Sequence, residues 1–207
     1  IVIPDTSLFH VDLSQNLTVE LNLNTSGWSG SPVLFANKDM RDPKNRGFAI
    51  VLIDEGKWRV NVGDGKKYQN ISGPVIADGL WHHLAIVFEK KKVKLYQDGI
   101  FTGALDISEI ERIDTEWGMA IGQDPLFSQK DFPPVKLNEI RIWATALPDS
   151  TLSHWMWTPI RSTHPEWSHL LGYWKLQKDS SNRILDSGPA VLHGTFRGGT
   201  PQWIDPH

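Results

Sequence analysis

The sequence contains no cysteine, which excludes disulfide bonds and thiolate metal sites and leaves the redox compartment undetermined. It also lacks a long apolar run. No stretch approaches the ~20 residues that a membrane-spanning helix needs, so we expect no membrane insertion. Neither sign of charge dominates, since 21 basic and 24 acidic residues give a formal net charge of −3. That balance argues against a nucleic-acid-binding surface.

An initiator methionine and a signal sequence are also missing, because the chain begins at Ile1. We therefore interpret it as a mature or excised segment. A chain of 207 residues buries roughly 70% of the surface that its unfolded form exposes, so it needs no disulfide bond or metal ion to be stable. A Pro- and Trp-rich link occupies residues 157–167, but the roughly 40 residues after it are too few for an independent core. We therefore expect a single domain over residues 1–207.

Helix signals are scarce, and short strand-like runs recur instead. The helix expected is "PDSTLSHWM" (148–156), where Asp149 or Ser150 would cap one or two turns. The strand-like runs are separated by turn sequences and lie at 17–23, 32–36, 47–53, 57–62, 117–122, 135–143, 169–177 and 184–196. Many short strands at this spacing indicate an antiparallel sandwich or barrel.

The clearest local signal is "LWHHLAIVFEKKKVKLYQDGIFTGAL" (80–105). An apolar, partly β-branched run at 84–88 ends at a short polar turn, and residues 93–98 then alternate with the period of two of a half-buried strand. Asp98-Gly99 follows, and Asp-Gly between such runs favours a type I′ hairpin, because both turn residues need a positive φ. The segment therefore predicts three consecutive antiparallel strands.

Three stretches carry a resemblance to a known superfamily. "GLWHHLAIVF…KVKLYQDGIFTG" resembles the W-H-H-L/V-A…LYVDG signature of laminin-G-like, concanavalin A-like jelly-roll domains. "LNEIRIWATALPDSTL" and "LLGYWKLQKDSSNRILDSGPAVLHGTF" are similar to later segments of such domains. In this order they span most of residues 47–196. The resemblance implies an all-β jelly roll with two stacked antiparallel sheets of six or seven strands each, but not a function, because the fold hosts lectins, adhesion modules and enzymes.

Catalytic signatures are weak. Retaining glycoside hydrolases need two carboxylates ~5–5.5 Å apart, and hydrolases of this fold present them as E-x-D-x-E. The nearest approach is "DISEIERID", which holds Glu109 and Glu111 without an intervening Asp. We interpret both as solvated loop carboxylates and expect no catalytic residue. His82 and His83 would point to opposite faces of a strand, so we interpret each as a hydrogen-bonded structural histidine.

Calcium is a further hypothesis, because it prefers several oxygen ligands from flexible loops. "NKDMRDPKN" (37–45) supplies oxygen ligands at Asp39, Asp42 and Asn45, and "IGQDPLFSQKD" (121–131) supplies them at Gln123, Asp124 and Asp131. The second is similar to the L-G-Q-E-Q-D calcium loop of pentraxins, although the Glu is missing. We hypothesise that one calcium ion binds Asp39, Gln123 and Asp124. The alternative is that these residues form ordinary Asx turns.

Ten tryptophans are many for this length. Trp58, Trp81, Trp143 and Trp174 fall in strand patterns and are expected in the core. Trp28 lies in the Gly- and Ser-rich "TSGWSGSP" and is predicted to contact a ligand, since a loop indole can stack on a sugar ring. The pattern leaves four others open: Trp117, Trp155, Trp157 and Trp167.

Together with the resemblance, these features predict a non-catalytic module of an extracellular, periplasmic or cell-surface protein that binds a glycan or protein ligand through loops at the rim of the sandwich. The resemblance also implies a neighbouring catalytic domain in a parent chain. Two alternatives remain: a glycoside hydrolase or polysaccharide lyase on the same fold, and a structural spacer.

Overall fold

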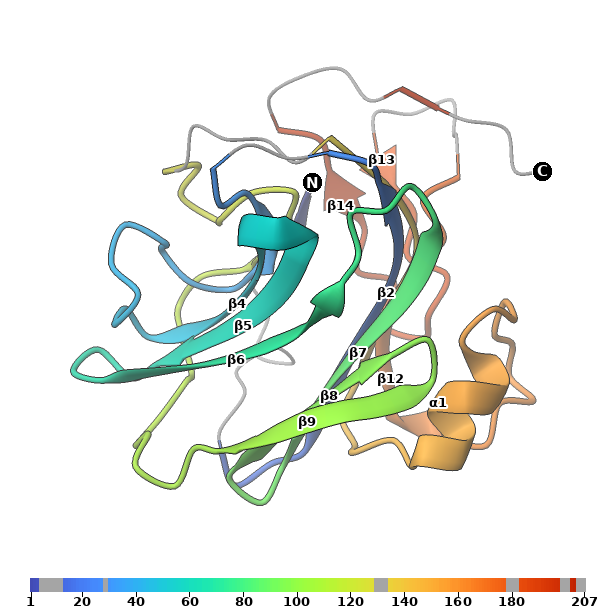
Figure 1. Cartoon of the computed structure of the whole chain (residues 1–207). Helices are drawn as coiled ribbons and strands as arrows, with labels where there is room; N and C mark the ends of the chain where they lie inside the picture. Colours follow the sequence, from blue (N-terminus) through green and yellow to red (C-terminus); the bar gives the residue numbers. More distant parts are fainter. Residues whose placement is uncertain (4–12, 28–29, 129–133, 178–182, 198–201, 204–207) are drawn as a thin grey trace.

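Two antiparallel sheets lie face to face in this computed structural model, which describes residues 1–3, 13–27, 30–128, 134–177, 183–197 and 202–203 (Figure 1). The first has six strands in the order β12-β11-β2-β7-β8-β9, and the second has eight in the order β13-β14-β1-β10-β3-β4-β5-β6. These counts refer to the described ranges. The predicted all-β antiparallel sandwich is confirmed.

The strands of the six-stranded sheet are β2 (Leu17–Thr25), β7 (Trp81–Glu89), β8 (Lys92–Gln97), β9 (Ile100–Asp106), β11 (Val135–Trp143) and β12 (Leu170–Trp174). Those of the eight-stranded sheet are β1 (Val2–Ile3), β3 (Val33–Ala36), β4 (Gly47–Leu52), β5 (Lys57–Gly63), β6 (Tyr68–Val75), β10 (Met119–Ile121), β13 (Arg183–Ile184) and β14 (Gly194–Thr195). Within the described residues, the helical elements are one α-helix, α1 (Asp149–Trp155), and two 3₁₀ turns, η2 (Asp54–Gly56) and η3 (Trp167–His169). None of these helices is long and apolar enough to cross a membrane.

The β7–β8–β9 meander forms as its sequence predicts. Asp98 and Gly99 have φ angles of 53° and 74°, the two positive values of a type I′ turn. The β7–β8 turn has the same geometry, with Lys90 at 49° and Lys91 at 63°. Both turns match the right-handed twist of the flanking strands. Strands β7 and β8 pair without a register shift, whereas the pairing of β8 with β9 shifts between Leu95 and Tyr96.

Alternate residues of the strands fill the space between the sheets. Leu21 of β2 and Ile86 of β7 belong to this main core and are inaccessible to solvent. Trp58 and Trp174 are fully buried there, as predicted. The Trp58 indole donates a hydrogen bond to the side-chain oxygen of Gln97 (3.0 Å) across the two sheets, so a large aromatic ring bridges the layers without leaving a buried donor unsatisfied.

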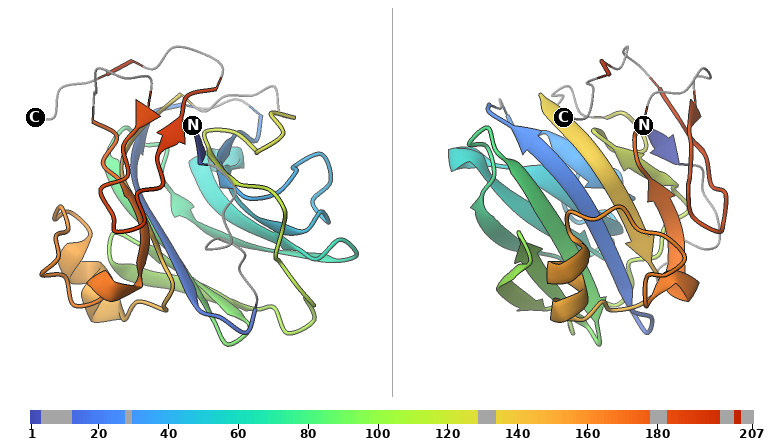
Figure 2. Two further views of the ribbon diagram at one scale, coloured as in Figure 1. Left: turned by 180° about the vertical axis from the view of Figure 1, so that it is seen from behind. Right: turned by 90° about the vertical axis from the view of Figure 1, so that its right-hand side faces the viewer.

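The outer face of the six-stranded sheet is partly covered by a second, smaller core. Helix α1 and the segment 156–169 lie across it (Figure 2), and Leu152 and Ile160 pack there against Trp143. We call residues 149–169 the cap. The expected side-chain cap of α1 is absent: the N-cap residue is Pro148, and Asp149 instead accepts a hydrogen bond from the Tyr96 hydroxyl (2.7 Å). This bond ties the helix to the sheet.

One expectation is wrong and one strand was not predicted. Trp81 is 45% exposed, because it is the first residue of β7 and its side chain faces outward beyond the edge of the cap. Strand β6 was not predicted, because its sequence "YQNISGPV" contains few apolar residues and ends in Gly73-Pro74-Val75. Gly and Pro are tolerated at the edge of a sheet, where β6 lies.

Candidate functional site

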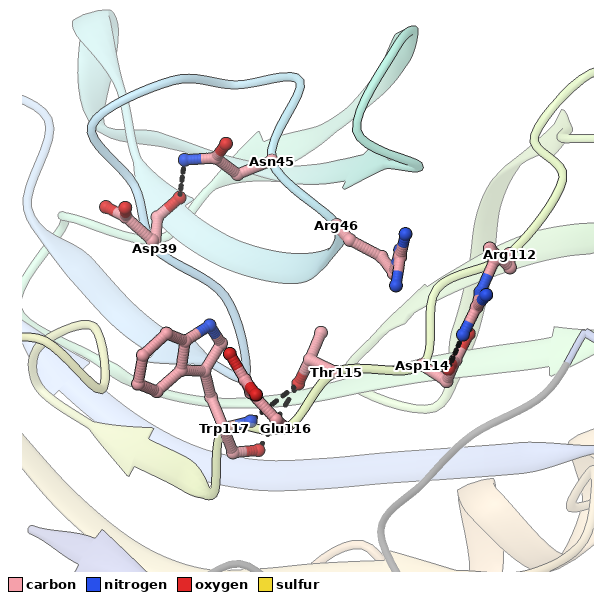
Figure 3. A pocket seen from close by; sticks show the side chains of 8 residues that line it. All are labelled: Asp39, Asn45, Arg46, Arg112, Asp114, Thr115, Glu116 and Trp117. Atoms are coloured by element: carbon pink, nitrogen blue, oxygen red, sulfur yellow. Dashed lines mark hydrogen bonds and ion pairs between the residues drawn. The ribbon is translucent and has the colours of Figure 1, made fainter.

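A pocket of about 580 Å³ lies at one rim of the sandwich, between the β3–β4 loop (37–46) and the β9–β10 loop (107–118) (Figure 3). The volume is within the range of small-ligand sites, ~300–1,000 Å³. Both loops contribute polar residues, and the lining consists of Asp39, Asn45, Arg46, Arg112, Asp114, Thr115, Glu116 and Trp117.

A buried lysine, Lys38, fixes the conformation of the β3–β4 loop. Lys38 donates hydrogen bonds to the side chain of Asn61 (2.7 Å) and to the carbonyl of Pro43 (2.8 Å). Burial lowers the pKa of Lys38 to about 7, although the carboxylates of Asp42 and Asp39 oppose this shift. The amide of Asn45 donates to the carbonyl of Asp39 (3.2 Å). These internal bonds fix the shape of the loop that forms one wall.

The β9–β10 loop forms the opposite wall and is anchored to the first. The hydroxyl of Thr115 donates to the carbonyl of Asn37 (2.9 Å), which lies just before Lys38 in the other loop. Arg112 forms an ion pair with Asp114 through two hydrogen bonds. These bonds, more than the nearby Arg46, lower the pKa of Asp114. The walls are therefore preformed rather than dependent on a ligand.

Three side chains of the pocket have no such internal role. The Arg46 guanidinium and the Glu116 carboxylate reach into the pocket from opposite loops (Figure 3), and within the described residues neither forms a hydrogen bond or an ion pair. The indole of Trp117 is 36% exposed beside them. An aromatic face with one acceptor and one donor of opposite charge suits a polar ligand that carries several hydroxyl groups.

The three predicted calcium ligands converge on the neighbouring part of this rim. Asp124 accepts hydrogen bonds from the backbone N–H groups of Met40 (2.9 Å) and Ser128 (2.7 Å), and from the Ser128 hydroxyl. Gln123 accepts from the backbone N–H of Asp124 (2.9 Å).

Asp39 is held by Arg41. Its carboxylate accepts from the Arg41 backbone at 2.9 Å, the pattern of an Asx turn, and from the Arg41 guanidinium at 2.7–3.0 Å. The hydrogen bond from Arg41 is the main cause of the lowered pKa of Asp39. Donors of the protein thus occupy oxygens of all three predicted ligands, and calcium would have to displace some of them. The described residues hold no group of three or more His, Asp or Glu able to bind a metal. Calcium binding stays a prediction.

Of the other predicted residues, Glu109 and Glu111 do not line the pocket. Trp28 is outside the described residues. Glu109 and Glu111 are exposed and pair with Lys67 (3.3 Å) and Lys66 (3.1 Å), so they are the solvated loop carboxylates that the sequence suggests.

His82 and His83 face opposite sides of β7, as the alternation predicts. His82 lies between Asp98 (2.8 Å) and Asp78 (3.1 Å), and His83 contacts the buried Glu20 (2.9 Å). Each histidine thus has a structural carboxylate partner.

Sequence reasoning missed Arg46 and Glu116 as site residues. No local motif contains them, because the two loops that carry them are about 70 positions apart and meet only through the sheet. Trp117 was counted as the start of a strand, whereas β10 begins at Met119. The adjacent acidic and aromatic residues Glu116 and Trp117 were the one local signal for a site.

Comparisons with known proteins place the fold. A family model described as the concanavalin A-like lectin/glucanases superfamily matches residues 1–153. A comparison with curated proteins finds no match. Among solved structures, a Bacteroides ovatus protein assigned to carbohydrate binding has a TM-score of 0.70 and 17% identity, with 94% of this chain and 54% of that chain covered.

Two further structures are similar at lower coverage. The Ruminococcus gnavus IT-sialidase CBM40 has a TM-score of 0.56 and 14% identity, over 69% of this chain and 83% of that one. Structures of it are bound to α2,3- and α2,6-sialyllactose. Domains LG4–5 of the mouse laminin alpha1 chain have a TM-score of 0.56 and 19% identity, over 72% and 40%.

The chain spans only about half the length of the Bacteroides ovatus protein, 54%. At these identities the structural likeness shows the fold alone, whereas the family model covers most of the sequence and agrees with the two stacked sheets. The chain therefore belongs to the concanavalin A-like lectin/glucanase superfamily.

Proposed function

We propose that this chain is a non-catalytic glycan-binding module of an extracellular or cell-envelope protein, and that its ligand occupies the pocket between loops 37–46 and 107–118. One observation carries the proposal: Glu116, Arg46 and the exposed face of Trp117 line one preformed cavity of about 580 Å³. A carboxylate accepts hydrogen bonds from sugar hydroxyls, a guanidinium donates to them, and an indole packs against the apolar face of a pyranose.

The similar structures support the class of ligand. The Bacteroides ovatus protein is assigned to carbohydrate binding, and the Ruminococcus gnavus module is bound to sialyllactose. A glycan is therefore favoured over a protein ligand. A neighbouring catalytic domain, acting on the same polysaccharide, belongs to the same proposal.

The charges of the pocket support binding rather than hydrolysis. A general acid in a glycoside hydrolase needs a raised pKa, but the pKa values of Asp39 and Asp114 are lowered by their arginine partners. Only Glu116 is left without an ion pair among the pocket carboxylates. We therefore expect no release of reducing ends when the isolated chain is incubated with a panel of polysaccharides, and release from any of them contradicts the non-catalytic role.

The binding test uses affinity electrophoresis over a polysaccharide panel, followed by calorimetry with oligosaccharides of the retained polymer. Glu116→Gln should weaken binding about tenfold, because it replaces a charged hydrogen bond by a neutral one, a loss of roughly 1.4 kcal/mol. Glu109→Gln is the matched control, since Glu109 lies in the same loop, is exposed and does not line the pocket. Equal affinities for the two variants would place the ligand elsewhere, and no binding to any polymer would refute the function.

Calcium is tested separately. The predicted ion would supply a hard cation that joins the two rim loops through Asp39, Gln123 and Asp124. Calorimetric titration with calcium should give a saturable heat that Asp39→Asn removes. Asp39 is the residue to change, because Asp124 also holds the backbone of Met40 and Ser128 and its loss would disturb the loops. An absence of heat in the parent chain refutes calcium binding.

A further inference from the structure

Two cross-strand rows of residues lie on the outer face of the six-stranded sheet, at the edge of the cap. The row next to the cap is partly buried, since Asn22 is 5% exposed and His83 is 1% exposed, whereas the row beyond it contains Trp81, which is 45% exposed. The first row is Lys136–Asn24–Trp81, and the second is Asn138–Asn22–His83, both running from β11 through β2 to β7. Lys136 is the only fully charged side chain in these rows. The side chains of these rows therefore offer mainly amide groups and aromatic rings.

Two exposed tryptophans flank His83 on this surface. Trp81 precedes His83 by two residues on the same face of β7, a separation of about 7 Å along the strand. Trp157 comes from the cap, and its ring meets the His83 ring edge-on with centroids 6.4 Å apart. Trp81 is 45% exposed and Trp157 is 47% exposed. Neighbouring exposed indoles of this size mark an interaction surface more often than a solvated one.

Polar atoms next to Trp157 lack partners. Oδ1 of Asn22 and Nδ1 of His83 are buried, and within the described residues neither has a hydrogen-bond partner. The other end of the Asn22 amide donates to the carbonyl of Met156, the residue before Trp157 (3.1 Å). A buried unsatisfied group costs ~1–3 kcal/mol, so such groups normally meet ordered water or a ligand.

We propose that Trp81, Trp157, Asn22, Asn24 and Asn138 form a second carbohydrate-binding surface, which we call the outer-face platform. A neutral glycan chain lies across it, with sugar rings stacked on the two indoles. Its hydroxyls bond to the amides of Asn24 and Asn138 and, as Trp157 shifts, reach Asn22 and His83. A neutral chain is favoured because the polar groups are amides rather than arginines or carboxylates.

The outer-face platform is distinct from the rim pocket. The pocket is formed by the β3–β4 and β9–β10 loops, whereas the platform is formed by β2, β7, β11 and the cap. The platform rests on the proposed function only for the class of ligand. Two separate surfaces would let one module hold a polymer at two points, which raises its avidity without any new contact at either surface.

The test is footprinting of the tryptophans in the whole chain. The protein is oxidised with N-bromosuccinimide in the presence and absence of neutral hexasaccharides of glucose, xylose, mannose and N-acetylglucosamine, and the modified indoles are mapped by mass spectrometry. One of these sugars should protect Trp81 and Trp157 together. Trp81→Ala and Trp157→Ala should each weaken binding of that sugar about tenfold, whereas Tyr68→Ala, an equally exposed aromatic on β6, should leave it unchanged.

The outcomes separate the two proposals. Protection of Trp117 alone, with no effect of the Trp81 and Trp157 variants, overturns the outer-face platform and leaves the rim pocket intact. Protection of Trp81 and Trp157 with no loss of affinity in Glu116→Gln supports the platform and refutes the rim pocket as the site for that glycan. No protection by any of the four sugars overturns the platform, including the case in which a protein partner covers the indoles instead.

Discussion

Replacing Arg141 by methionine should destabilise this domain more than any other single loss of charge. Arg141 is 1% exposed beneath the cap. Its guanidinium donates to Glu139 (2.8 Å) and to the carbonyls of Trp155 (3.0 Å) and Thr158 (2.8 Å), and it lies 4.0 Å from Glu20. The change leaves two buried carboxylates without their cation.

The magnitude follows from the burial of these carboxylates. Glu20 and Glu139 are 1% and 8% exposed, so water cannot replace the guanidinium, and removal of one partner of such a pair costs ~3–5 kcal/mol. The remaining donors limit the loss: the Trp143 indole and His83 still bond to Glu20 at 2.7 and 2.9 Å, and the Tyr173 hydroxyl still donates to Glu139.

Urea unfolding, followed by tryptophan fluorescence, measures the effect. With a denaturant slope of ~2–3 kcal/mol/M, the midpoint of Arg141→Met should fall by roughly 1–2 M. Arg41→Met is the control, because Arg41 is exposed and solvent screens its pair with Asp39, so the loss of this pair should change the midpoint little. A loss of under 1 kcal/mol in Arg141→Met, similar to the control, would refute the argument that this cation holds the cap to the sheet.

Three further predictions concern stability. Burial lowers the pKa of His82, but hydrogen bonds to Asp98 and Asp78 outweigh it and raise the pKa above its ordinary value of 6.5. The stabilisation from His82 is therefore complete below pH 6.5 and is lost as the pH rises through the folded-state pKa. The difference in urea midpoint between the parent chain and His82→Gln should accordingly shrink from pH 5.5 to 8.5. The opposite trend should come from Lys38, whose pKa is lowered to about 7 in the folded state. Above pH 7 the folded protein loses this proton while the unfolded chain keeps it, so the free energy of unfolding rises with pH by at most ~1.4 kcal/mol per pH unit. Lys38→Met should abolish this rise. Gly73→Ala should lower the free energy of unfolding by ~1–3 kcal/mol, because a Cβ would lie 2.1 Å from the Trp58 indole nitrogen; a melting temperature equal to that of the parent chain would contradict it.

Local signals were sufficient for much of the fold. The Asp98-Gly99 turn, the apolar β-branched run of β7 and the alternation in β8 require nothing beyond their own residues, since positive φ, strand propensity and a period of two are local properties. The edge strand β6 escaped detection because an edge position tolerates Gly, Pro and polar residues, and its identity as a strand depends on pairing with β5.

A β-bulge in β11 shows most directly which structural features the sequence does not predict. Asn138 pairs with Asn22 and Arg141 with Glu20, so β11 has one more residue than β2 over this interval, and Glu139 takes up a φ of 53°. The bulge places Asn138 and Arg141 on the same face, because their partners Asn22 and Glu20 are two residues apart on β2. A strict alternation would have put these two residues, three positions apart, on opposite faces, and the sequence carries no mark of the shift.

The sequence by itself determined the all-β class, the meander and the superfamily, because these follow from turn residues, periodicity and motif order within short stretches. Tertiary structure alone decided which tryptophans are exposed, since Trp81 and Trp143 have similar strand contexts but only Trp143 lies under the cap. It also assembled the rim pocket from two loops that are distant in sequence. Burial and proximity depend on which segments the fold packs together, and no single stretch of the chain contains that information.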